Sequence, residues 1–165
     1  MYMKMYMKNR LVCIFIVFCI FLLWGFTMPR YLYYLPTIPI YSNKEADIVY
    51  DIVQKRTNDD VEFFSLTDPD ITYAFAPYVK EDIHELLTII TQPHVITTIM
   101  LFKYGINRPR PYQINPRITY LDSKTDKTPS MPSGHALQAY YLAKVLSKRY
   151  PEKKEMFSRI AKKCD

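Results

Sequence analysis

Residues 129–150 read PSMPSGHALQAYYLAKVLSKRY, a proline-containing loop followed by an uninterrupted amphipathic stretch. Proline is disfavoured inside helices, so this stretch predicts a helix over Gly134–Tyr150, between Pro132 and Pro151. Its apolar spacing predicts an inner face of Leu137, Tyr140, Tyr141 and Val145 and an outer face of Lys144, Lys148 and Arg149.

Helical patterns extend over much of the remaining chain. They predict helices over Glu45–Lys55, from Glu81 to about Pro93, over Val95–Lys103, and over Glu152–Lys163. The Val95–Lys103 segment is strongly apolar, and we expect it to be buried in a bundle. Residues 57–77 are acidic and aromatic, are interrupted by Pro69, and are predicted as a loop with short turns. Residues 107–127 contain prolines without clear periodicity and are predicted as a loop. No segment shows the alternation of a strand, so the predicted fold class is all-α.

Two short stretches stand out chemically. KYGINRPRP (103–111) places a lysine at a helix end, followed by two Arg-Pro units whose proline rings stiffen the backbone. A guanidinium fork and an ammonium group suit a phosphate. In PSGH (132–135), backbone N–H groups at a helix start also favour an anion. Ser133 offers a hydroxyl donor, Gly134 allows close approach to the backbone, and His135 can protonate a leaving oxygen.

Together these stretches resemble the type 2 phosphatidic acid phosphatase (PAP2) and vanadium haloperoxidase superfamily, and look closest to its class A acid phosphatase branch. The family's first signature, Lys, six residues, Arg-Pro, is matched by Lys103, Arg110 and Pro111, and its second by Pro132–His135. A register through Arg108 leaves four intervening residues and does not fit, so Arg108 is an auxiliary charge at best.

The resemblance covers about residues 81–165 and implies an all-α bundle with a metal-free phosphate site. It implies that Lys103, Arg110, Ser133 and Gly134 bind substrate and that His135 is the catalytic acid. No cofactor is implied, except vanadate in a haloperoxidase-like protein. The expected substrate is a phosphorylated small molecule or a lipid phosphate.

The third family signature, Ser-Arg, five residues, His, three residues, Asp, has no match. Ser158-Arg159 is followed after five residues by Asp165, where the pattern needs the nucleophilic histidine. We therefore expect the helical domain, residues 45–165, to be incomplete at its C-terminus. His84 and His94 are interpreted as structural or exposed. The alternative function is an inactive protein that binds phosphate or anionic lipid without a nucleophile.

The N-terminal part predicts a membrane anchor. Residues 11–28 carry no charge, and an 18-residue helix spans about 27 Å. Residues 1–10 contain Lys4, Lys8 and Arg10, which predicts a basic cytoplasmic tail and a single-pass topology with the helical domain on the extracytoplasmic or lumenal side. Residues 29–44 are a Pro- and Tyr-rich linker. A cleaved secretory signal is the alternative for the apolar segment.

Charge is distributed unevenly along the 165 residues. The formal charge is +4 over residues 1–30, −7 over 31–102 and +9 over 103–165, which sums to the net +6 of the chain. Such a basic region suits an anion site, whereas no basic-aromatic motif indicates nucleic-acid binding. The three cysteines, Cys13, Cys19 and Cys164, predict neither a disulfide framework nor a metal cluster. The sequence leaves the oligomeric state open.

Overall fold

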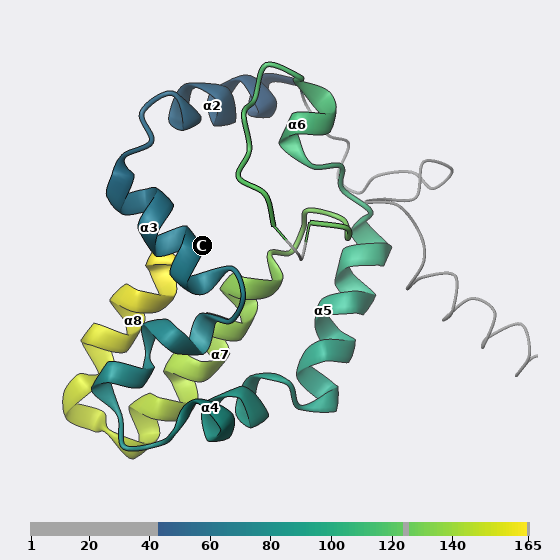
Figure 1. Cartoon of the computed structure of the whole chain (residues 1–165). Coiled ribbons are helices and arrows are strands. Elements are labelled where there is room, and N and C mark those ends of the chain that lie inside the picture. Colours follow the sequence, from purple (N-terminus) through teal and green to yellow (C-terminus); the bar gives the residue numbers. More distant parts are fainter. Residues whose placement is uncertain (1–42, 124–125, 165) are drawn as a thin grey trace, which may run out of the picture.

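The computed structural model describes residues 43–123 and 126–164, and within them the protein is all-helical, with no strand (Figure 1). This confirms the predicted fold class. The α-helices are α2 (Asn43–Val53), α3 (Asn58–Thr67), α4 (Ile83–Ile90), α5 (Pro93–Ile106), α6 (Pro111–Ile114), α7 (Gly134–Arg149) and α8 (Lys154–Lys163). Three 3-10 turns complete the fold: η1 (Ile71–Ala74), η2 (Ala76–Tyr78) and η3 (Pro151–Lys153). The predicted tail, membrane anchor and most of the linker lie outside the described residues.

Most helix boundaries follow from capping residues and prolines. The Asp82 carboxylate accepts a hydrogen bond from the Glu85 N–H at 2.8 Å and caps α4. Pro93 occupies the first turn of α5, where its missing N–H costs nothing. Ser133 caps α7, and Pro151 separates α7 from α8. The predicted helices at these places are confirmed.

The prediction of a loop with short turns over residues 57–77 is wrong for α3, whereas the short turns η1 and η2 agree with it. Thr57 and Asp60 form a capping box in which each side chain bonds the backbone N–H of the other residue. The signal was therefore present in the sequence as Thr57-Asn-Asp-Asp60. The predicted loop over 107–127 also contains a helix, the single turn α6, which begins at Pro111.

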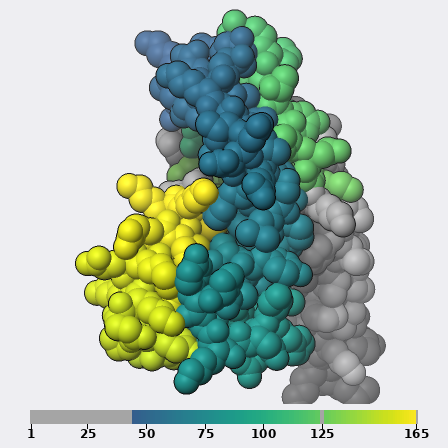
Figure 2. Space-filling model, turned by 60° about the vertical axis from the view of Figure 1, so that its left-hand side comes forward, coloured from purple at the N-terminus to yellow at the C-terminus, as the bar shows by residue number. Residues whose placement is uncertain are grey.

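The hydrophobic core lies between η1, α4, α7 and α8. Its fully buried large side chains include Ile71, Phe75, Leu86, Leu142, Leu146 and Phe157. Figure 2 shows α8, in yellow, beside the blue and teal segments that run from α3 to α4. The Lys163 ammonium lies 4.2 Å from the centre of the Phe63 ring, which places the end of α8 against α3.

The buried face of α7 differs from the predicted one. Tyr140 is 47% exposed, and Leu137, Tyr141 and Val145 are only half-buried. The buried residues are Ala136, Ala139, Leu142, Ala143 and Leu146. Small alanines let the neighbouring helices approach α7 closely, so tertiary packing selects this face over the larger aromatic residues.

Helix α5 lies at one side of the molecule and is not the buried helix that its composition predicted (Figure 1). Only Val95, Ile99 and Lys103 are buried, whereas Leu101 and Phe102 are 69% and 57% exposed. No single helix among the described residues is long and apolar enough to cross a membrane. The bent pair of Ile83–Ile90 and Pro93–Ile114, with 51° between its parts, meets the length and composition criteria jointly.

Candidate active site

The C-terminal end of α5 positions the first group of candidate residues. Asn107 ends the helix in the left-handed conformation, with φ at 50°, and its N–H donates to the Lys103 carbonyl at 2.8 Å. Asn107 is fully buried. The chain therefore turns sharply after the helix, and the RPRP segment (108–111) leads from this turn into α6.

Lys103 is buried between α5 and the loop that precedes α7. Its ammonium group donates a hydrogen bond to the Pro129 carbonyl at 2.6 Å, and the residue is 5% exposed. Burial lowers the pKa of Lys103 to about 8, and the nearby positive charge of Arg110 acts in the same direction. A bound anion would favour the charged form of Lys103, because the attraction between opposite charges is stronger in a buried site than in water.

Arg110 reaches the same loop from the start of α6. Its Nε donates to the Thr128 carbonyl at 3.0 Å, and its backbone N–H donates to Gln113 Oε1 at 2.7 Å. The two cationic side chains of the predicted phosphate site therefore bind adjacent carbonyl groups, those of Thr128 and Pro129. The structure brings Lys103 and Arg110 to the same loop.

The N-terminus of α7 lies against Lys103. Ser133 Oγ accepts a hydrogen bond from the Ala136 N–H at 3.2 Å, a contact that does not use its hydroxyl proton. A Cβ atom added to Gly134 would lie 3.8 Å from Lys103 Cε and 3.7 Å from Ile99 Cγ2. These are ordinary contacts, so the protein itself does not require glycine here.

His135 is half-buried in the first turn of α7. Burial lowers its pKa below the usual value; the carboxylates of Asp68 and Asp70 oppose this shift, and Lys103 and Arg110 reinforce it. His135 and Ser133 line a pocket of about 320 Å³. The other lining residues come from α3, its C-terminal end and the end of α8: Asp60, Phe63, Phe64, Thr67, Asp68, Lys163 and Cys164.

Sequence reasoning missed several neighbours of these residues. The carbonyl groups of Thr128 and Pro129 hold the two cations, and Asp68 acts electrostatically on His135. Thr128 and Pro129 lie just before the PSGH motif, which was a usable signal. Asp68 had no such signal, because only the tertiary structure, in which α3 packs on η1 and η1 on α7, brings it near His135.

The remaining histidines lie at exposed positions. His84 is on the outer face of α4, and His94 is on α5 with its ring edge against Tyr141, 5.7 Å between ring centres. Both agree with the sequence interpretation of structural or exposed residues. Among residues 43–123 and 126–164, no group of three or more His, Cys, Asp or Glu side chains is arranged to hold a metal ion. Burial raises the pKa of the Cys164 thiol to about 11.

Residues 84–161 match the family model described as PAP2 superfamily. The matched region contains both KYGINRPRP and PSGH, and the match supports the superfamily that the two signatures predict. No curated protein and no solved structure matches the chain.

Proposed function

We propose, from the PAP2-superfamily match of residues 84–161, that this chain binds the phosphate group of phosphoric monoesters and acts as a phosphatase. One observation carries the proposal. Lys103 and Arg110 both reach the segment that leads into the N-terminus of α7, with contacts of 2.6 and 3.0 Å to consecutive carbonyl groups. Two cations and a helix N-terminus therefore converge, as phosphate recognition requires.

Each residue has a distinct role in this proposal. Lys103 and Arg110 bind phosphate oxygens, and the Ser133 hydroxyl donates a further hydrogen bond while its oxygen still caps α7. The backbone at Gly134 lets an oxygen approach closely. In family members that carry the third signature, its histidine attacks phosphorus and forms a phosphohistidine as the P–O bond to the leaving group breaks. Protonated His135 donates its proton to that leaving oxygen, which releases a neutral alcohol, and water then hydrolyses the phosphohistidine to phosphate. The pocket of about 320 Å³ beside His135 has room for the alcohol part of a substrate.

The finer features of the proposal come from the sequence. We assign the chain to the class A acid phosphatase branch, with residues 11–28 as a membrane anchor and the helical domain on the extracytoplasmic or lumenal side. The site needs no metal in this proposal, and vanadate would enter only in a haloperoxidase-like reaction. A lowered pKa of His135 suits an acid phosphatase, because its general acid is protonated only in acidic solution.

A second candidate function is phosphate binding without turnover. Family members that carry the third signature use its histidine as the nucleophile. The two other histidines of the described residues, His84 on α4 and His94 on α5, are both exposed. Neither is proposed as that nucleophile. Loss of a covalent nucleophile removes most catalysis while electrostatic binding can persist. In this case the same residues would bind phosphate or an anionic lipid headgroup.

The test uses the full chain in a mild detergent, with hydrolysis of an aryl phosphate and calorimetric binding of inorganic phosphate measured on the same samples. The variants are Lys103→Ala and His135→Ala, and Lys144→Ala is the control because Lys144 is exposed on α7. Turnover that both site variants lose and the control retains would support the phosphatase. Binding that Lys103→Ala loses, without turnover in any sample, would support the second candidate.

Absence of both phosphate binding and turnover in the folded wild-type chain would refute both candidate functions. Retention of the helical circular dichroism spectrum checks that each variant is folded.

A further inference from the structure

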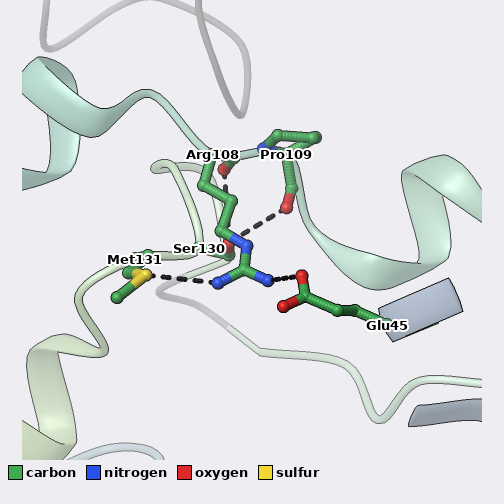
Figure 3. A network of polar contacts seen from close by, with 5 residues as sticks. All are labelled: Glu45, Arg108, Pro109, Ser130 and Met131. Atoms are coloured by element: carbon green, nitrogen blue, oxygen red, sulfur yellow. Dashed lines mark hydrogen bonds and ion pairs between the residues drawn. The ribbon is translucent and has the colours of Figure 1, made fainter. Parts of the chain in front are cut away.

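Arg108 lies between the two candidate phosphate ligands in sequence, yet its side chain is held by other groups. Figure 3 shows its guanidinium group between Glu45 and Met131. One terminal nitrogen forms an ion pair with the Glu45 carboxylate on α2, and the other donates to Met131 Sδ at 3.2 Å. The side chain of Arg108 is 23% exposed and that of Glu45 is 51% exposed.

The backbone around Arg108 holds the same loop. The Ser130 N–H donates to the Arg108 carbonyl at 2.9 Å, and Ser130 Oγ donates to the Pro109 carbonyl at 2.9 Å (Figure 3). Residues 130 and 131 are therefore bound at both the backbone and the side chain of Arg108. They lie between the carbonyl groups that bind Lys103 and Arg110 and the start of α7.

These contacts join three segments that are far apart in sequence. Helix α2 contributes Glu45, the segment after α5 contributes Arg108 and Pro109, and the loop before α7 contributes Ser130 and Met131. A shift of that loop would move Ser133 and His135 relative to Lys103 and Arg110. Phosphate binding by all these groups at once depends on their spacing.

We propose that Arg108 is a positioning residue which, held by Glu45, fixes the loop before α7 at the distance that the phosphate site needs. The inference rests on the proposed phosphate function. It assigns Arg108 a role beyond that of an additional positive charge, and it gives α2 a part in the site through Glu45.

Substitution of Glu45 separates positioning from simple electrostatics. Glu45→Gln removes a negative charge on the Arg108 side of the site, so electrostatic attraction alone would strengthen phosphate binding. The positioning role predicts weaker phosphate binding instead. A neutral amide holds the Arg108 guanidinium less firmly, so the loop before α7 moves more. We expect phosphate affinity to fall by about three- to tenfold, from a lost ion pair and a displaced ligand set.

The experiment compares the full-length wild-type chain, Glu45→Gln and Asp51→Asn in detergent. Asp51→Asn is the matched control, since Asp51 is an exposed carboxylate on the same helix. Two quantities are measured: binding of inorganic phosphate by calorimetry, and hydrogen–deuterium exchange of peptides covering residues 126–137 without phosphate. The double variant Glu45→Arg/Arg108→Glu restores an ion pair with reversed polarity and tests whether the pairing itself matters.

Faster exchange of residues 126–137 and weaker phosphate binding in Glu45→Gln, with Asp51→Asn like the wild type, would support the inference. Slower exchange and tighter binding in the double variant than in Glu45→Gln would support it further. Unchanged exchange together with unchanged or stronger binding in Glu45→Gln would overturn it. If the wild type binds no phosphate, the proposed function fails, and faster exchange in Glu45→Gln would still support the loop-fixing role of the pair.

Discussion

Lys103 carries a primary amine into a position that is only 5% exposed, where a hydrocarbon side chain would be less costly. Its ammonium group donates to one carbonyl, that of Pro129, and a second cation, Arg110, lies close enough to lower its pKa. Two neighbouring positive charges with reduced solvation favour a bound anion. The burial of Lys103 therefore has two effects: it lowers the stability of the folded chain, and it strengthens the attraction to an anion in the proposed function.

The first prediction concerns the pH dependence of anion binding. Lys103 has a pKa of about 8, so it is charged below this pH and loses its proton as the pH rises through it. We expect sulfate affinity to fall between pH 7 and pH 9. Sulfate is used because its own charge stays constant over this range. Calorimetric titrations at pH 7, 8 and 9 measure the change.

Lys103→Met is the control for this prediction, since it removes the titrating amine and keeps an unbranched side chain. It should bind sulfate weakly and with a much flatter pH profile. A wild-type affinity that stays constant from pH 7 to pH 9 would contradict the assignment of Lys103 as an anion ligand.

At this scale the sequence was informative where a residue type had a fixed spacing to a proline or a helix start. The spacing of Lys103 to Arg110 and the PSGH motif identified side chains that the structure places around one loop. The partners of those side chains were not predictable. Glu45 and Asp68 come from other helices, and only tertiary packing brings them to Arg108 and His135.

At the scale of the helix, Ser133 serves both α7 and the proposed site. Its oxygen accepts from the Ala136 N–H, which satisfies one of the N–H groups that every helix leaves without a partner in its first turn. We predict that Ser133→Ala lowers the free energy of unfolding by about 1 kcal/mol, the usual cost of losing such a cap. Urea denaturation followed by circular dichroism measures this loss.

Ser133→Asp distinguishes the cap from the anion site. Aspartate is also a good N-cap and should retain most of the stability, whereas its negative charge should repel phosphate and abolish measurable binding. Ser147→Ala is the control, because Ser147 lies on the same helix and bonds only within it, to the Ala143 carbonyl at 2.6 Å. Phosphate binding by Ser133→Asp at wild-type strength would contradict the placement of the anion at this helix start.

Helix prediction failed where the periodic pattern was weak, and the prediction of burial failed where the pattern was uniformly apolar. The α3 sequence has no clear apolar stripe, and only its capping box identifies it. The α5 sequence is apolar on nearly every side, so composition suggested burial without indicating which face would be covered. The structure covers the face of Val95, Ile99 and Lys103, which is spaced four residues apart, and leaves Leu101 and Phe102 exposed.

At the scale of the whole molecule, the core and the candidate site use different parts of the bundle. The main hydrophobic cluster joins η1, α4, α7 and α8, whereas Lys103, Arg110 and Glu45 belong to α5, the start of α6 and α2. Helix α7 takes part in both, because its N-terminus meets the site and its middle lies in the core. An all-α class was predictable from periodicity, but this division was not.

The core predicts a large cost for losing a side chain from α7. Leu142 is fully buried in the cluster, and we expect Leu142→Ala to reduce the free energy of unfolding by about 2–5 kcal/mol, through lost burial and the cavity that remains. Tyr140→Ala on the exposed face of the same helix is the control and should cost much less. Similar losses for the two variants in urea denaturation would contradict the observed orientation of α7.

The same division predicts that stability is uneven across the molecule. Segments with few buried apolar side chains open locally at lower free energy than the core. Peptides from α7 and α8 should therefore exchange amide hydrogens more slowly than peptides from α2, α5 and α6 in the full chain. Inorganic phosphate should slow exchange around residues 103–111 and 128–135 and leave α8 unchanged, because the proposed site lies in the first two segments and outside the core. Uniform slowing in every helix would instead indicate general stabilisation, and protection confined to α8 would place the anion away from Lys103 and Arg110.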